Sequence, residues 1–261
     1  MIKAKKSLGQ NFLIDKNIIN KIINTVSISD KEILEVGPGT GNLTREILRN
    51  NPNKMYLVEK DAFLAASLKE IINERVKIFN EDILKFNEKA LSKNKVIVFG
   101  NLPYNISTEI LSTWITNLND DYWFSDLVLM FQKEVADRII AQFNTSAYGR
   151  LSILANWRLN INKICDISPE SFSPRPKIHS TLIHFTPKKK FAEIKNPINL
   201  EKITRIFFSH RRKMLKKPFN QIFNGNTDLL NKFNLDLNLR PQNLDCDTYY
   251  KLTIEYEKLS S

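Results

Sequence analysis

The feature that most constrains this chain is a run of three glycines within five residues, placed after a short apolar stretch. The segment Glu35-Val36-Gly37-Pro38-Gly39-Thr40-Gly41 ends that stretch and opens a helix-like one. Only 7 glycines occur in 261 residues, so their concentration here is unusual. A glycine-rich turn between a strand and a helix lets the backbone approach a nucleotide closely. The alternative is a tight turn that binds nothing.

Short apolar stretches alternate with helix-like ones from Lys31 to about Gln132, which predicts an α/β fold. Because apolar residues follow one another in most of these stretches, we expect strands of a parallel sheet that are buried on both faces. The predicted strands are Glu32 to Val36, Met55 to Val58, Val76 to Phe79, Val96 to Phe99, Leu127 to Phe131, and a closing pair, Asn162 to Ile167 and Ile178 to Thr186. The predicted helices are Leu43 to Arg49, Ala62 to Asn73, Ser107 to Leu118, Lys133 to Phe143 and Tyr148 to Leu159.

The composition changes after Pro187, where we place a domain boundary. Residues 188–261 hold 15 Lys and Arg against 8 Asp and Glu. Their spacing predicts a basic amphipathic helix with Ile203 and Phe207 on one face and Arg205, Arg212 and Lys216 on another. We therefore predict an α/β domain of residues 1–187 and a small all-α domain of residues 188–261.

The overall charge points to a polyanionic partner. The formal net charge is +11, which favours nucleic acid before a membrane surface. Cys165 and Cys246 have no metal-ligand spacing, so we expect no metal site and a reducing compartment. No secretory segment and no apolar run of about eighteen residues is present, which predicts a cytoplasmic protein that does not enter a membrane.

Two acidic residues end the strands that follow the glycine turn. Glu59 can accept both hydroxyl protons of a ribose, and Asp82 can accept from the amino group of an adenine. Acids at strand ends are common, so each alone is weak evidence. The spacing G-x-G-x-G also differs from the G-x-G-x-x-G of dinucleotide enzymes. Together these features resemble the S-adenosylmethionine site of Rossmann-like class I methyltransferases.

A second loop, Gly100-Asn101-Leu102-Pro103-Tyr104, follows the fourth strand and is suited to hold an amine. The side-chain oxygen of Asn101 and the backbone carbonyl of Leu102 can accept its two hydrogens, and Tyr104 offers an aromatic face. We expect Phe172, held in place by Pro174 and Pro176, to cover the other face of an extruded adenine. The alternatives are a turn with a buried Asn and Tyr, and a Phe that anchors the core.

These segments, in this order, closely resemble the bacterial small-subunit ribosomal RNA adenine dimethyltransferases (the KsgA/RsmA family). Further shared motifs are Ser7-Leu8-Gly9-Gln10-Asn11-Phe12-Leu13, Gln132-Lys133-Glu134-Val135, Tyr148-Gly149-Arg150-Leu151-Ser152 and Arg211-Arg212-Lys213. The resemblance implies a seven-stranded, mostly parallel sheet, a small helical domain, and S-adenosylmethionine as cofactor. It implies the transfer of four methyl groups to two adjacent adenines in a hairpin near the 3′ end of 16S ribosomal RNA, by a monomer acting on an assembling 30S subunit.

The resemblance also assigns residues that the pattern alone does not single out. It implies that Asn11 and Leu13 close over the cofactor and that Gly37, Gly39, Glu59, Asp82 and Asn101 complete the site. The cluster Arg211, Arg212, Lys213 and Lys216 suits phosphate contacts with RNA, although such a run is also typical of a solvated face.

Other functions remain open at this stage. A nicotinamide-dependent oxidoreductase is disfavoured by the glycine spacing, and a non-catalytic RNA-binding factor would share the fold. The related adenine dimethyltransferases that act on large-subunit RNA share several motifs. The string Asn-Leu-Pro-Tyr-Asn-Ile-Ser-Thr and the carboxy-terminal Arg-Arg-Lys favour the small-subunit branch.

Overall fold

The computed structural model describes residue 5 and residues 9–71, 73–118 and 122–260. Ser7 and Leu8, which belong to the amino-terminal motif, lie outside the described residues. Contacts between Cα atoms divide the chain into two compact units. Unit 1 is 1–113, 118–136 and 161–187, and unit 2 is 114–117, 137–160 and 188–261. Residues 188–261 therefore do not form a unit alone, because they pack with residues 114–117 and 137–160.

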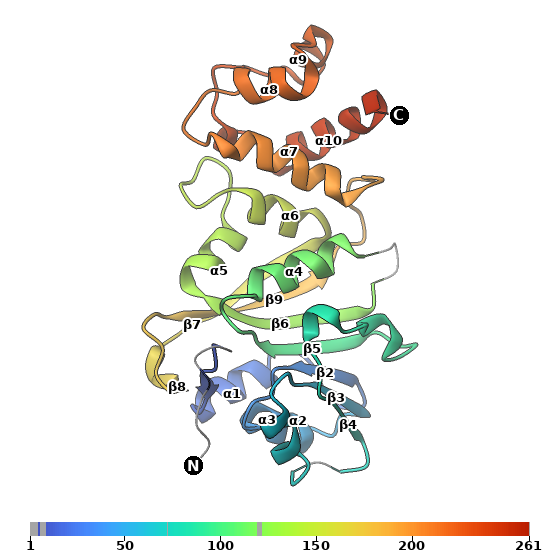
Figure 1. Cartoon of the computed structure of the whole chain (residues 1–261), viewed down its shortest axis with the longest axis vertical. Helices are drawn as coiled ribbons and strands as arrows, with labels where there is room; N and C mark the ends of the chain where they lie inside the picture. The colour runs from blue at the N-terminus through green and yellow to red at the C-terminus, as the bar shows by residue number, and fades with distance from the viewer. Residues whose placement is uncertain (1–4, 6–8, 72, 119–121, 261) are drawn as a thin grey trace. The chain divides into compact units, whose positions relative to one another are not determined.

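The described residues of unit 1 hold a seven-stranded sheet of order β4-β3-β2-β5-β6-β9-β7 (Figure 1). Its strands are β2 (Glu32–Val36), β3 (Lys54–Val58), β4 (Val76–Phe79), β5 (Val96–Asn101), β6 (Phe124–Gln132), β7 (Leu159–Ile167) and β9 (Ser180–Pro187). The neighbouring strands β4, β3, β2, β5 and β6 pair in parallel, and β9 pairs antiparallel with β6. The predicted α/β fold with a mostly parallel seven-stranded sheet is confirmed.

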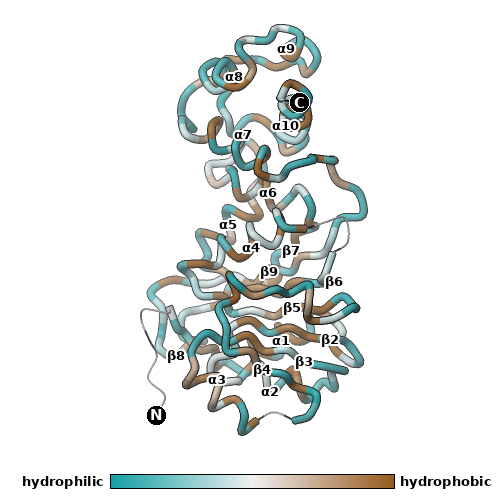
Figure 2. The backbone as a smooth tube through the Cα atoms, turned by 45° about the vertical axis from the view of Figure 1, so that its right-hand side comes forward, coloured by the Kyte–Doolittle hydropathy of each residue, from teal (hydrophilic) through white to brown (hydrophobic). Residues whose placement is uncertain are grey.

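The central strands are buried because both faces of the sheet are covered. Every residue of β2 is buried, and Ile33 and Leu34 point to opposite faces with no exposed surface. Figure 2 shows the hydrophobic colour gathered along these strands, with hydrophilic residues in the loops between them. Strand β4 differs from the prediction, since it lies at the sheet edge and is only partly buried.

Helices α1 (Lys16–Ile23), α2 (Asn42–Arg49) and α3 (Ala62–Leu68) pack their apolar side chains into one core with residues of the sheet. The predicted helix from Ala62 to Asn73 is too long. Helix α3 ends at Leu68, because the backbone hydrogen bonds that follow join residues three apart and tighten the chain. Helices α4 (Ser107–Thr116) and α5 (Lys133–Ile140) begin where predicted and end earlier. A two-stranded sheet joins β1 (Phe12–Leu13) to β8 (Phe172–Ser173).

Unit 2 is helical. Helix α7 (Pro197–Ser209) packs against α6 (Arg150–Arg158), α8 (Lys216–Phe223) and α10 (Cys246–Ser260), and α9 (Thr227–Phe233) lies between α8 and α10 in the chain. The predicted continuous basic helix is wrong. The backbone turns after Ser209. There the amide of Lys213 donates to the backbone carbonyl of His210, and the amide of Leu215 donates to the backbone carbonyl of Leu239. Pro218 in the first turn of α8 is the sequence signal for this restart.

No helix among the described residues is both long and apolar enough to cross a membrane.

Gly41 tests how tightly the glycine turn packs. Its φ is +75°, and an added Cβ would overlap the Cδ1 of Ile71 and lie 2.9 Å from the Cδ2 of Leu68. Gly225 has a similar φ of +71°, but the nearest atom to its Cβ would be 3.6 Å away. We expect Gly41→Ala to lower the free energy of unfolding, measured in urea, by about 1–3 kcal/mol more than Gly225→Ala. Equal losses would contradict this packing.

Candidate functional site

A cavity lies at the carboxyl ends of the parallel strands β2, β3 and β5, the edge where open α/β sheets bind ligands. Its walls come from the amino-terminal segment, the glycine turn, the ends of β3 and β4, and the loop after β5. Predicted site residues that line it are Asn11, Leu13, Gly37, Gly39, Glu59, Asp82, Asn101, Leu102 and Tyr104. The structure therefore brings together residues that are spread over about a hundred positions of the sequence.

The glycine turn is required by its backbone conformation and by packing. Gly37 and Gly39 have φ values of +67° and +59°, a region that favours glycine. A Cβ on Gly39 would lie 2.8 Å from the ring of Phe12, because β1 covers the turn. A Cβ on Gly37 would project toward the carbonyl of Asn101. The turn thus leaves a backbone-lined surface between the two loops, which fits a nucleoside.

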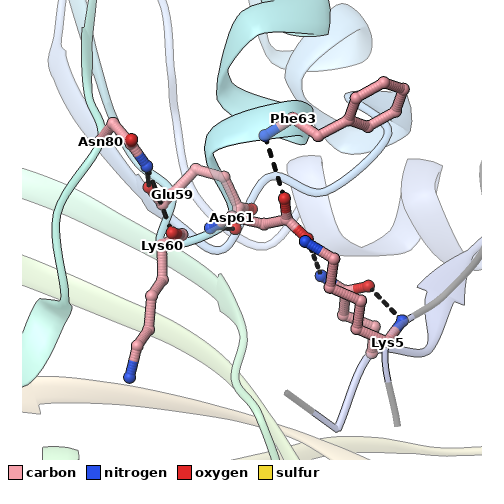
Figure 3. Close-up of polar contacts among 7 residues, drawn as sticks. Lys5, Glu59, Lys60, Asp61, Phe63 and Asn80 are labelled. Atoms are coloured by element: carbon pink, nitrogen blue, oxygen red, sulfur yellow. Dashed lines mark hydrogen bonds and ion pairs between the residues drawn. The ribbon is translucent and has the colours of Figure 1, made fainter. Parts of the chain in front are cut away.

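Glu59 is a buried carboxylate held by backbone amides. Its two oxygens accept from the amide of Asp61 at 2.8 Å and from that of Gly39 at 3.1 Å. Burial raises the pKa of Glu59, and the amide hydrogen bonds oppose that rise. Figure 3 shows Glu59 between Asp61 and Asn80. The side-chain amide of Asn80 donates to the backbone carbonyl of Glu59. Each carboxylate oxygen has a second lone pair, so this group retains capacity to accept ribose hydroxyls.

Asp82 is engaged differently from the sequence prediction. One oxygen contacts the Nζ of Lys60 at 2.7 Å and the other accepts from the amide of Leu84. The Lys60 ammonium lowers the pKa of Asp82, so this carboxylate is ionised at neutral pH. It lines the cavity beside Ile83. Its role toward an adenine stays a prediction, in competition with the Lys60 contact.

Glu35 is a cavity residue that the sequence reasoning did not select. It is 2% exposed and accepts from the hydroxyl of Thr44 at 2.7 Å. Burial raises its pKa to about 8, with a further contribution from the charge of Glu59. Glu35 is therefore mostly protonated at pH 7 and adds little negative charge beside Glu59. The sequence signal that could have indicated Glu35 is a carboxylate between the apolar residues of a buried strand.

The loop after β5 is fixed at both ends. The side-chain amide of Asn101, the last residue of β5, donates to the backbone carbonyl of Asn11 at 2.7 Å, so its oxygen is the end left to accept from a hydrogen-bond donor in the cavity. The phenol of Tyr104 is 2.6 Å from the hydroxyl of the buried Ser180 on β9, and burial raises its pKa. Neither Asn11 nor Ser180 could be paired with this loop from sequence, because they lie far away in the chain.

Phe172 stands apart from the cavity. It is 3% exposed, pairs with Leu13 in the small sheet, and packs in the core beside helix α1. It is not among the residues that line the cavity. This placement fits the alternative of a core-anchoring Phe, and its contact with an extruded adenine stays a prediction that requires repacking.

The predicted RNA-binding cluster lies in unit 2, on the turn between α7 and α8 and at the first residue of α8. Arg212, Lys213 and Lys216 are exposed. Arg211 is partly buried and donates to the carbonyl of Thr145 and the side chain of Gln242, both at 3.3 Å. Three cations are therefore presented to solvent, while Arg211 also ties the turn to its neighbours.

Among the described residues, no group of three or more His, Cys, Asp or Glu side chains could hold a metal ion. The buried carboxylates of the cavity instead accept hydrogen bonds from backbone amides and hydroxyls.

Comparisons with known proteins find relatives over almost the whole chain. A model of the ribosomal RNA adenine dimethylase family matches residues 1–258. The chain is 63% identical over 258 residues to a "Ribosomal RNA small subunit methyltransferase A" of Pelagibacter ubique, covering 99% of this chain and 98% of that protein. It is 41% identical over 268 residues to the same-named protein of a Wolbachia strain, covering 99% and 96%.

Two solved structures share the architecture. A dimethyladenosine transferase from Plasmodium falciparum superposes with a TM-score of 0.82 at 27% identity, covering 95% of this chain and 98% of that one. The 23S rRNA methyltransferase ErmE gives a TM-score of 0.70 at 20% identity, covering 96% and 100%, and supports the fold alone.

The raised pKa of Glu35 makes stability depend on pH. The native chain keeps the proton until about pH 8, whereas the unfolded chain loses it near the ordinary value of 4.5. Between these values the unfolded state binds fewer protons, so the free energy of unfolding falls as pH rises, by at most about 1.4 kcal/mol per pH unit. We expect Glu35→Gln to flatten this fall in urea denaturation measured from about pH 5 to about pH 8. Parallel profiles for the two proteins would refute the assignment.

Proposed function

Because this chain belongs to the ribosomal RNA adenine dimethylase family, we propose that it uses S-adenosylmethionine to dimethylate the exocyclic amines of two adjacent adenines in small-subunit ribosomal RNA. The target is a hairpin near the 3′ end of 16S RNA. The observation that carries the proposal is the loop after β5. Asn101 lines the cavity beside the glycine turn, and its amide nitrogen is occupied by Asn11.

The cofactor fits the part of the cavity built from the glycine turn and Glu59. When bound, it supplies an electrophilic methyl group on a sulfonium centre. Gly37 and Gly39 would allow the backbone to approach it, and the Glu59 carboxylate, held by the Gly39 amide, would accept its ribose hydroxyls. Leu13 and Asn11 wall the cavity on the amino-terminal side, and Asp82 lies at the expected adenine end.

The chain's contribution to the reaction is to align a weak nucleophile. The lone pair of an adenine amine is delocalised into the ring. If the Asn101 oxygen and the Leu102 carbonyl accept its two hydrogens, the lone pair turns toward the methyl group. Tyr104, whose hydroxyl lies 2.6 Å from that of Ser180, would stack on the base. No strong base is required, because the nitrogen loses its proton to water after it has become cationic.

RNA binding is assigned to the exposed cations on the turn between α7 and α8 and at the start of α8. Arg212, Lys213 and Lys216 can contact phosphates without reading sequence, and Arg211 braces the turn. We further propose that the enzyme is a cytoplasmic monomer and that it acts on an assembling 30S subunit. Incubation with naked 16S RNA and with immature 30S particles, followed by mapping of dimethyladenosine by mass spectrometry, separates the two substrates.

We expect Asn101→Ala to lower methyl transfer by at least about 100-fold, since it removes an oxygen that acts on the reacting amine. RNA binding, measured by filter retention, should change little. Asn53→Ala, at an exposed loop position, serves as the matched control and should keep wild-type turnover. Unchanged methylation in Asn101→Ala would falsify the assigned role and favour a non-catalytic RNA-binding factor.

Charge reversal on the turn should weaken RNA binding and reduce its salt dependence. For Arg212→Glu, and for the double variant Arg211→Glu/Arg212→Glu, the slope of log K against log salt should fall by about one per lost phosphate contact. Lys69→Glu, at the exposed end of α3, makes the same change in net charge as Arg212→Glu and should leave the slope unaltered. A slope that falls equally in both would indicate an effect of net charge alone.

A further inference from the structure

Asp61 is a buried carboxylate that joins two distant segments beside the cavity. Its exposed fraction is 4%, yet one of its oxygens lies 2.9 Å from the Nζ of Lys5 and 3.2 Å from the side-chain nitrogen of Gln10. The other oxygen accepts from the amide of Phe63 at the start of α3. Figure 3 shows Asp61 between Phe63 and Lys5. The Lys5 ammonium lowers the pKa of Asp61, so these contacts involve an ionised group at neutral pH.

Asp61 is also connected to the cofactor side of the cavity through Glu59. The backbone amide of Asp61 donates to Glu59, and the second oxygen of Glu59 accepts from Gly39. The position of the Asp61 backbone therefore sets the orientation of the Glu59 carboxylate. Asp61 itself is not among the residues that line the cavity, whereas Glu59 and Gln10 are.

The wall that Asp61 holds is the segment from Gln10 to Leu13. Hydrogen bonds fix this segment to three different parts of unit 1: the end of β5, the start of α2 and the residue before α3. The carbonyl of Asn11 accepts from Asn101 at 2.7 Å, and the carbonyl of Leu13 accepts from Asn42 at 2.8 Å. The Gln10 side chain donates to Asp61 and accepts from the Lys5 amide, so it uses both ends of its own amide. The Gln10 contact anchors the end of the wall that lies farthest from the small β1–β8 sheet.

We propose that Asp61 is a positioning residue for the cofactor. It sets the Glu59 carboxylate through its backbone and the Gln10–Leu13 wall through its side chain, without contacting the cofactor itself. This inference rests on the proposed role of Glu59 in holding the ribose. Its consequence is that cofactor affinity depends on an ion pair and a hydrogen bond outside the cavity.

Asp61→Asn separates this role from helix capping. Asparagine caps a helix as well as aspartate does, so α3 keeps its start. Its amide nitrogen, however, would face the Lys5 ammonium and the Gln10 amide, which are both donors. We expect the Kd for S-adenosylmethionine, measured by calorimetry, to rise about tenfold, as for the loss of one hydrogen bond to a charged group. Because Asn101 is untouched, kcat at saturating cofactor should change by less than about threefold.

Asp245→Asn is the matched control, since Asp245 accepts from the amide of Thr248 at the start of α10 in unit 2. It should leave the Kd within about twofold of wild type. A wild-type Kd in Asp61→Asn would overturn the proposal, and so would a loss of kcat with an unchanged Kd.

Gln10→Ala tests the same tie from the opposite side. Gln10→Ala should raise the Kd. The double variant Gln10→Ala/Asp61→Asn should have a Kd within about twofold of that of Asp61→Asn, because both substitutions remove the same contact. If Asp61→Asn does not fold, Gln10→Ala decides alone, and an unchanged Kd overturns the proposal.

Glu59→Ala separates the positioning role of Asp61 from the proposed cofactor site. If it weakens cofactor binding while Asp61→Asn and Gln10→Ala do not, the positioning role fails and the proposed function stands. If Glu59→Ala leaves the Kd unchanged, the proposed cofactor site fails, and the positioning role fails with it.

Discussion

The hydrogen bond from the side chain of Asn101 to the backbone carbonyl of Asn11 is the interaction on which the rest of the site depends. An amide can present either oxygen or nitrogen to a ligand, and only the oxygen can accept from an amine. By occupying the nitrogen, Asn11 decides which end faces the cavity. The amino-terminal segment therefore takes part in the arrangement of the acceptor loop as well as in the wall of the cofactor site.

Electrostatics in the cavity follow from burial and from the distribution of protons among three carboxyl groups. Glu35 is neutral because it is buried in the sheet, Glu59 is stabilised by two backbone amides, and Asp61 is compensated by Lys5. Three charges this close together would repel one another strongly. Neutralising one and pairing another leaves Glu59 as an acceptor suited to ribose hydroxyls.

The helical unit shows how tertiary context changes a pattern. Residues 203 to 216 have helical spacing, and the pattern predicts one basic helix. The structure ends α7 at Ser209 and begins α8 at Lys216, because Leu215 donates to Leu239 from a segment farther along the chain. The break places Arg212 and Lys213 on a turn and Lys216 at the start of α8, and all three side chains are exposed. It also gives Arg211 a bracing role that spacing alone does not reveal.

The sequence by itself determined the α/β fold, the positions of the central strands and the loops that carry Gly37, Glu59, Asp82 and Asn101. Buried parallel strands require unbroken apolar runs, and glycine turns are local, so both can be read from neighbouring residues. The tertiary structure alone decided the partners: Asn11 on Asn101, Ser180 on Tyr104, Lys5 and Gln10 on Asp61, and the packing of Phe172 in the core. These contacts join residues far apart in the chain, and no local preference specifies them. The protonation of Glu35 belongs with them, because desolvation depends on everything packed around a group and not on its neighbours in sequence.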